Sequence, residues 1–180
     1  MKEDVRSWTK KAFEFVLQGN FDEAIECFDE AIRLNPNDAI TWANKGLALG
    51  TFERYNEAIE CCDEAIRLNP NDAITWAIKG RMLGKLGRHN EEIECYDEAI
   101  RSDSNNADVW HDKGVALGRL GRYNEEIECY DEAIRLDPNN DSAWYDKSLA
   151  LNKLGKFEEA GECFEKARLI LKKLKAKKRW

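Results

Sequence analysis

Cysteine and histidine are the residue types in this 180-residue chain that could bind a metal, form a disulfide or serve a nucleophilic site. Five of the six cysteines recur every 34 residues, at Cys27, Cys61, Cys95, Cys129 and Cys163. Equivalent residues of stacked repeats are separated by at least the roughly 8–10 Å of helix packing. A disulfide needs Cα atoms within about 7 Å, and zinc needs four ligands within about 2.3 Å. We therefore expect six free thiols, including Cys62, in small apolar sites.

Catalytic chemistry has little support in the remaining residues. The two histidines, His89 and His111, accompany no nucleophile motif and no phosphate-binding glycine loop. The carboxylates follow the 34-residue period, and each set, such as the acidic residues of 26–30, is followed one helical turn later by an arginine, here Arg33. Paired charges on a solvated helix face explain this pattern. The sequence predicts no enzyme activity, no metal site and no cofactor.

An internal repeat sets the positions of all these residues. The fifteen residues Asp29 to Ala43 recur letter for letter as Asp63 to Ala77, 34 residues later. Tryptophan keeps the same spacing, at Trp8, Trp42, Trp76, Trp110 and Trp144. Five such units account for all but the two ends of the chain, so the sequence predicts one array of repeats.

Each unit has the pattern of two amphipathic helices, as in residues 39–72. Between the two helices most units place a glycine, which a left-handed helix cap favours, whereas the second unit has Glu53 there. Proline follows the second helix at Pro36, Pro70 and Pro138 and ends it. Gly46, Gly80 and Gly114, four residues after a tryptophan, predict close approach of the paired helices.

These residues resemble the tetratricopeptide repeat family, whose 34-residue unit has Trp, Gly, Ala and Pro at the corresponding positions. The resemblance implies an all-α fold, a right-handed α-solenoid of five helix-turn-helix repeats. Residues 1–4 would form a lead-in and 175–180 a basic tail, with repeats at 5–38, 39–72, 73–106, 107–140 and 141–174. Departures from the family pattern are Glu92 and Glu126 for Ala, Ser104 for Pro, and Ala12 and Ser148 for Gly.

Charge and hydropathy limit the partners. No apolar run approaches the roughly 20 residues that span a membrane, and no secretory signal begins the chain, so we expect a cytoplasmic protein without membrane contact. The net charge is −7, although residues 172–180 contain five lysines, one arginine and no acid. The acidic body argues against nucleic acid as the partner. The tail is either a soluble helix end or a contact for acidic helices or a polyanion.

A concave groove is the binding surface that the resemblance implies, lined by the first helix of each repeat. The tryptophan stripe should be buried in packing, which leaves a complementary stripe facing the groove. That stripe is apolar in the N-terminal half and carries both charges in the C-terminal half. Its residues are Thr9, Phe13, Leu17, Ala43, Asn44, Leu47, Ala77, Ile78, Arg81, Lys85, Asp108, His111, Asp112, Val115, Arg119, Tyr145, Asp146, Leu149 and Lys153.

Three functions remain open at this point. The first is a non-enzymatic scaffold that binds a peptide or helical segment of a partner protein in the groove. The second is a self-assembling module, a homo-oligomer formed through the terminal repeats. This is because residues 169–174 extend the last helix with apolar side chains that no further repeat covers. The third is an adaptor that binds a polyanion through the basic tail.

Overall fold

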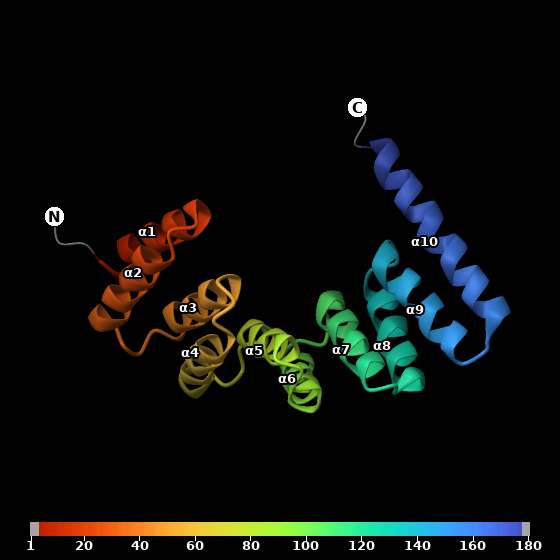
Figure 1. The fold of residues 1–180 in the computed structure, drawn as a ribbon, viewed down its shortest axis with the longest axis horizontal. Coiled ribbons are helices and arrows are strands. Elements are labelled where there is room, and N and C mark those ends of the chain that lie inside the picture. Colours follow the sequence, from red (N-terminus) through yellow and green to blue (C-terminus); the bar gives the residue numbers. More distant parts are fainter. Residues whose placement is uncertain (1–3, 178–180) are drawn as a thin grey trace. The chain divides into compact units, whose positions relative to one another are not determined.

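The structure, a computed structural model, describes residues 4–177, which form ten α-helices and no strand (Figure 1). The all-α solenoid of helix-turn-helix repeats that the sequence predicts is therefore confirmed. The chain divides into unit 1, residues 1–91, and unit 2, residues 92–180. Unit 1 contains α1 (Val5–Gln18), α2 (Phe21–Leu34), α3 (Ala39–Thr51), α4 (Tyr55–Leu68) and α5 (Ala73–Lys85).

The sixth helix, α6 (His89–Ser102), begins at the end of unit 1 and continues into unit 2. The other helices of unit 2 are α7 (Ala107–Arg119), α8 (Tyr123–Leu136), α9 (Asp141–Lys153) and α10 (Phe157–Lys177). The last helix has 21 residues, whereas α2, α4, α6 and α8 have 14 each. The second helix of the last repeat therefore runs on into the basic tail, as expected. Residues 178–180 of that tail lie outside the described residues.

Tight turns join the two helices of each pair. The glycines predicted at these turns adopt the left-handed conformation, with φ between 72° and 75°. In the second repeat Glu53 adopts the same conformation, with φ of 59°, although a side chain there is unfavourable. The turn geometry is therefore common to all repeats, and one of them keeps it without the residue that favours it.

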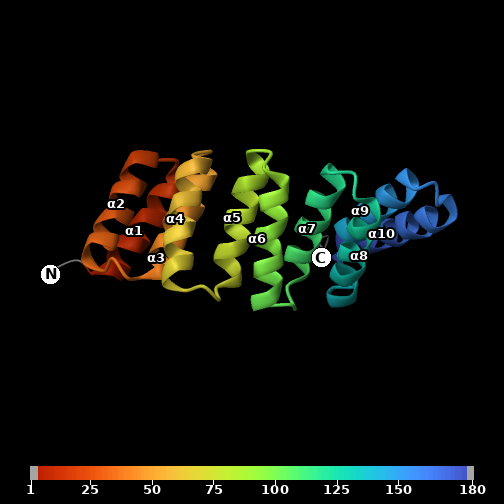
Figure 2. The ribbon, with the colours of Figure 1, turned by 90° about the horizontal axis from the view of Figure 1, so that it is seen from below.

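In unit 1, consecutive helices pack against each other, and α1 also contacts α3 (Figure 2). Phe28 of α2 is fully buried and forms a core cluster with Ala12 of α1 and Ala48 of α3. A Cβ on Gly46 would lie 3.0 Å from the carbonyl oxygen of Ala58. The predicted close approach of paired helices is thus present between α3 and α4.

In unit 2, α8 packs between α7 and α9, and α10 packs on α9. Tyr130 of α8 is 1 % exposed, and a Cβ on Gly114 of α7 would lie 2.6 Å from its ring. Leu117 and Leu151 complete the buried apolar surface of α7 and α9. The glycine therefore makes room for the tyrosine ring.

The tryptophans have a role that their spacing did not reveal. The five tryptophans of the repeats are half-buried, so the expectation that these rings are buried is wrong. Four of their indole N–H groups donate to a main-chain oxygen six residues earlier, over 2.9–3.2 Å, in the pairs Trp42–Pro36, Trp76–Pro70, Trp110–Ser104 and Trp144–Pro138. The ring thus fixes the turn between repeats to the helix that follows.

Ion pairs also join consecutive repeats. A lysine of each following repeat contacts an aspartate at N–O distances of 2.5–2.6 Å, in Lys45–Asp29, Lys79–Asp63, Lys113–Asp97 and Lys147–Asp131. These lysines are 16–21 % exposed. The sequence assigned each set of acidic residues to the arginine one turn later. That arginine pairs with one glutamate of its set, as Arg33 does with Glu30, whereas the aspartate pairs with the lysine of the next repeat.

All six cysteines are buried, and none of them forms a disulfide. Burial raises the pKa of the Cys61 and Cys129 thiols to about 11, so both stay protonated near neutral pH. This environment agrees with the expected role of the cysteines as small apolar side chains.

Candidate binding surfaces in the two units

Unit 1 contains a groove of about 600 Å³ along α1 and the start of α3, here called the apolar groove. Leu17 and Ile40 at this groove are 88 % and 69 % exposed. Phe13 packs edge-on against Phe28 in the core, with ring centroids 5.6 Å apart. The groove is lined by Val5, Arg6, Thr9, Lys10, Phe13, Glu14, Leu17, Asp38, Ile40, Thr41 and Asn44.

Several polar side chains of the apolar groove have partners within the chain. The hydroxyl of Thr9 donates to the carbonyl oxygen of Val5 over 2.8 Å, and that of Thr41 donates to Asp38 over 2.5 Å. Lys10 and Glu14 lie one turn apart and 3.8 Å from each other. Because these groups are engaged, the groove offers a partner mainly apolar surface.

Unit 2 contains a pocket of about 320 Å³ formed by α7, α8 and α9, here called the charged pocket. Aliphatic side chains of α7 and α9 form part of its wall, and Arg119 and Lys153 are its exposed cations. The pocket is lined by Val115, Gly118, Arg119, Tyr123, Glu126, Tyr130, Asp146, Leu149, Ala150 and Lys153.

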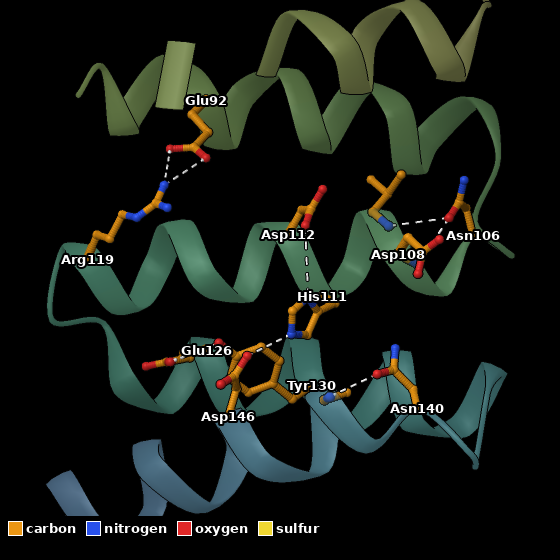
Figure 3. A network of polar contacts seen from close by, with 12 residues as sticks. Glu92, Asn106, Asp108, His111, Asp112, Arg119, Glu126, Tyr130, Asn140 and Asp146 are labelled. Atoms are coloured by element: carbon orange, nitrogen blue, oxygen red, sulfur yellow. Dashed lines mark hydrogen bonds and ion pairs between the residues drawn. The ribbon is translucent and has the colours of Figure 1, made fainter. Parts of the chain in front are cut away.

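A histidine between two aspartates links α7 to α9 beside the charged pocket (Figure 3). Nε2 of His111 lies 2.8 Å from a carboxylate oxygen of Asp146, and its Nδ1 lies 3.8 Å from Asp112. The His111 ring also packs against Tyr130, with centroids 5.4 Å apart. Hydrogen bonding to Asp112 and Asp146 raises the pKa of His111 to about 9, so the imidazolium persists at neutral pH.

The floor of the charged pocket holds a buried carboxyl group. Glu126 is 8 % exposed and accepts a hydrogen bond from the Tyr130 hydroxyl over 3.1 Å. Burial raises the pKa of Glu126, and burial likewise raises that of Tyr130. A Cβ on Gly118 would lie 2.6 Å from the Glu126 carboxylate, so the absence of a side chain at 118 leaves room for it.

One repeat earlier, the equivalent glutamate has a cation as its partner. Glu92 is 3 % exposed, and the guanidinium of Arg119 lies 3.3 Å from its carboxylate (Figure 3). Glu92 and Glu126 hold the same repeat position, as do Arg119 and Lys153. Lys153 borders the charged pocket, but its ammonium makes no ion pair with Glu126 among the described residues.

The two surfaces contain about half of the residues that the sequence places in the stripe. The apolar groove contains four of its residues, Thr9, Phe13, Leu17 and Asn44. The charged pocket contains five, Val115, Arg119, Asp146, Leu149 and Lys153, and His111 contacts Asp112 and Asp146 beside it.

Other members of the stripe lie elsewhere. Ala43 and Ile78 are buried, and Leu47 and Ala77 are half-buried. Arg81, Lys85, Asp108 and Tyr145 are exposed, and the Tyr145 ring lies 6.1 Å from that of Phe164. The assignment of the whole stripe to partner binding stays a prediction, although the two buried residues have little surface to offer.

Sequence reasoning missed the residues that give each surface its character. Ile40 belongs to the exposed side of its helix but was not named, and Glu92 and Glu126 were noted only as departures from alanine. Arg119, one of the charged residues that the sequence places in the stripe, is engaged with Glu92. A charged residue at a repeat position that is otherwise alanine was the signal that could have revealed the pocket.

The end of the last helix carries a third surface. Arg168, Leu171, Lys172, Lys175 and Ala176 line a groove of about 470 Å³ on α10. Leu169, Leu171 and Leu174 are 41–50 % exposed, whereas Ile170 is buried. The apolar stripe of the last helix is thus uncovered within the part of the chain that the structure describes.

Residues 4–177 contain neither a metal-binding cluster nor a membrane-spanning helix. No group of three or more histidine, cysteine, aspartate or glutamate side chains is arranged there to hold a metal ion. None of the helices there combines the length and apolar character needed to cross a bilayer.

Models of the tetratricopeptide repeat match residues 5–38, 39–72, 73–106, 107–140 and 129–162. No curated protein sequence matches the chain.

Similar solved structures share the fold. A crystal structure of MamA is 24 % identical over 98 % of this chain and 99 % of its own, with a TM-score of 0.86. MamA from Desulfovibrio magneticus RS-1 is 20 % identical over 96 % and 98 %, also with a TM-score of 0.86. YrrB, described as a TPR protein with an unusual peptide-binding site, is 21 % identical over 97 % and 92 %, with a TM-score of 0.76.

Proposed function

Because the chain belongs to the tetratricopeptide repeat family, we propose that it is a non-enzymatic scaffold that binds a segment of a partner protein. The apolar groove of unit 1 is the first contact in this proposal. Its two exposed aliphatic side chains, Leu17 and Ile40, and the half-buried Phe13 would accept apolar side chains of an extended or helical segment. The observation that carries the proposal is this exposed apolar surface on a chain in which 35 % of residues are charged.

A displayed library of random peptides, selected on the intact chain, tests the proposal. We expect enriched peptides with leucine, isoleucine or phenylalanine at helical or alternate spacing. A double variant, Leu17→Lys with Ile40→Lys, should lose these peptides but unfold at the same temperature, because both side chains are exposed.

Ile74→Lys is the matched control. Ile74 holds the same repeat position as Ile40 and is 67 % exposed, but it does not line the apolar groove. Peptides should bind this variant as they bind the unaltered chain. Equal binding to the double variant would show that the groove is not the contact.

Self-association is a second candidate, favoured by one observation at the last repeat. Phe28, Cys62, Tyr96 and Tyr130 hold one repeat position, and each is 0–1 % exposed. Phe164 holds the same position in the last repeat and is 46 % exposed. A second copy stacked head to tail on the last repeat would cover Phe164. It would also bring its own Lys11 towards Glu165 of the first copy. Lys11 and Glu165 hold the repeat positions of the lysine–aspartate pairs that join consecutive repeats.

Sedimentation over a wide range of protein concentration separates the two candidates. Self-association predicts a mass that rises with concentration and returns to the monomer in Phe164→Glu. Leu17→Lys, which alters the groove alone, should leave the mass unchanged. A monomer at every concentration would exclude this second candidate.

Three further expectations from the sequence stay proposals. The absence of enzyme activity, a cytoplasmic location and a polyanion contact of the basic tail are supported only by composition and by the fold.

A further inference from the structure

The charged pocket of unit 2 holds a carboxyl group that is buried but incompletely partnered. One oxygen of Glu126 accepts the hydrogen bond from Tyr130, and no other donor reaches the carboxylate among the described residues. No side-chain oxygen in the described residues is both fully buried and without a hydrogen-bond partner, so the Glu126 oxygen that no donor reaches is accessible from the pocket that it lines. A carboxylate with so little contact with water is stabilised by a cation or by further hydrogen bonds. The equivalent position is alanine in three of the five repeats, Ala24, Ala58 and Ala160, so folding of the repeat does not require an acid there.

The equivalent glutamate of the preceding repeat, Glu92, has the kind of partner that Glu126 lacks among the described residues. There, the Arg119 guanidinium lies 3.3 Å from the Glu92 carboxylate, which is as deeply buried as Glu126. A planar guanidinium is weakly hydrated and can donate two parallel hydrogen bonds to one carboxylate, which suits a half-apolar pocket. The Glu92–Arg119 pair therefore indicates which group fits beside a buried glutamate of this repeat.

We propose that the charged pocket binds an arginine side chain of the partner protein, with Glu126 as the main acceptor and Asp146 as the second. The pocket volume of about 320 Å³ is at the lower end of the range for ligand sites, which suits one side chain better than a whole ligand. Val115 and Leu149 pack against the methylene groups, and Tyr123 offers an aromatic ring to the guanidinium. This inference rests on the proposed function, because it specifies one residue of the bound segment.

Two carboxylates at or near the charged pocket already have a cation as partner. Asp146 is shared with the His111 imidazolium, and Arg119 is engaged with Glu92, which leaves Glu126 and Lys153 without an ion-pair partner among residues 4–177. Lys153 stands where an arginine occupies the earlier repeat, so its ammonium competes with an incoming guanidinium for Glu126. Lys153→Ala should consequently strengthen arginine binding.

The test uses N-acetyl-arginine amide as the probe and follows backbone amide resonances of the intact chain. We expect saturable shifts that centre on Gly118, Tyr123 and Leu149. N-acetyl-citrulline amide has the same shape without the charge, so it should bind about tenfold more weakly or not at all. N-acetyl-lysine amide should be intermediate.

Two variants of α8 test whether Glu126 is the carboxylate that binds the probe. Glu126→Gln keeps the shape and an acceptor for the Tyr130 hydroxyl but removes the charge, and should weaken the arginine probe about tenfold. Glu128→Gln removes the same charge from an exposed position of the same helix and should leave the affinity unchanged. Far-ultraviolet circular dichroism confirms that each variant is folded.

Several outcomes would overturn the inference. These are shifts outside unit 2, no saturable shift up to the solubility of the probe, equal affinity for citrulline, or unchanged affinity in Glu126→Gln. Tighter binding of N-acetyl-aspartate amide would instead assign the pocket to an anion. The probes do not require a protein partner, so their failure would leave the apolar groove as the proposed contact. Loss of peptide binding with the arginine probe still bound would refute the scaffold function alone.

Discussion

The apolar groove and the charged pocket are built from the same repeat positions but present opposite chemistry. Phe13 and Leu17 of α1 correspond to Val115 and Arg119 of α7, and Ala24 of α2 corresponds to Glu126 of α8. The helices, turns and joints that hold these positions recur in both units. A few side chains therefore decide what a repeat can bind, because the shared backbone tolerates either set.

The largest difference in the free energy of unfolding should appear at the repeat position that Ala24 and Glu126 share. Ala24 is fully buried, and Val16 of α1 stands where α7 has Gly118, so the first repeat leaves less room for a carboxylate there. We expect Ala24→Glu to lower the free energy of unfolding by about 3–5 kcal/mol, because it buries an unpaired charge in a packed core.

The reciprocal change in unit 2 is the matched comparison. Glu126→Ala should change the free energy of unfolding by less than about 1 kcal/mol. The variant no longer buries a carboxyl group, and this gain offsets the loss of the hydrogen bond from Tyr130. The Tyr130 hydroxyl also borders a pocket that water can enter, so water can replace the lost acceptor. Urea unfolding measures both, and similar losses in the two variants would contradict the contrast.

The next effect concerns the cations at the end of the first helices. Arg119→Glu should lower the free energy of unfolding by about 3 kcal/mol, because it sets a second acid against the buried Glu92. Lys85→Glu, at the same repeat position in unit 1, should cost within about 0.5 kcal/mol, because Lys85 is exposed. Equal costs would mean that Glu92 does not depend on Arg119.

A pH dependence should be specific to unit 2. The pKa of His111 is raised from 6.5 to about 9 in the folded chain. Its contribution is therefore complete below pH about 6.5 and is lost as the pH rises through about 9. The expected loss is about 2 kcal/mol, because the two carboxylate partners are partly exposed.

His111→Thr introduces the residue that α1 has at this repeat position, Thr9. Urea unfolding at several pH values should show the decline in the unaltered chain but not in this variant. A titration midpoint of the His111 imidazole near 6.5 in nuclear magnetic resonance spectra would exclude the paired imidazolium.

The smallest effect tests what the two units share. Trp42→Phe in unit 1 and Trp110→Phe in unit 2 each remove one indole hydrogen bond to a turn carbonyl. Both should lower the free energy of unfolding by about 1 kcal/mol. Thermal unfolding of the two variants checks this, and a marked difference between them would show that the joints are not equivalent.

The repeated fold was predictable because each 34-residue unit must bury its apolar face on the next, and Trp42 and Trp76 mark the period directly. Phe13 and Leu17 line the same groove because helical spacing determines which side of α1 they occupy, and their role in partner binding stays a prediction. The acceptors of the tryptophan N–H groups were not predictable, since main-chain oxygens carry no sequence signal.

The charged pocket lay beyond sequence reasoning for a different reason. Its carboxyl group depends on space left by Gly118, eight residues earlier, and on the Tyr130 hydroxyl one turn later. Arg119 finds its partner Glu92 27 residues back along the chain. Such combinations follow from the packing of three helices and not from the properties of any one of them.

Photo-crosslinking in cells of the source organism tests the central claim most directly, that the chain holds a partner segment in the apolar groove. A photoreactive phenylalanine in place of Ile40, and separately in place of Ile74 or Phe164, reports what lies against each position. We predict an adduct with a different protein from position 40 and none from position 74. Adducts at position 164 with the mass of two copies of the chain, and none at position 40, would contradict the account.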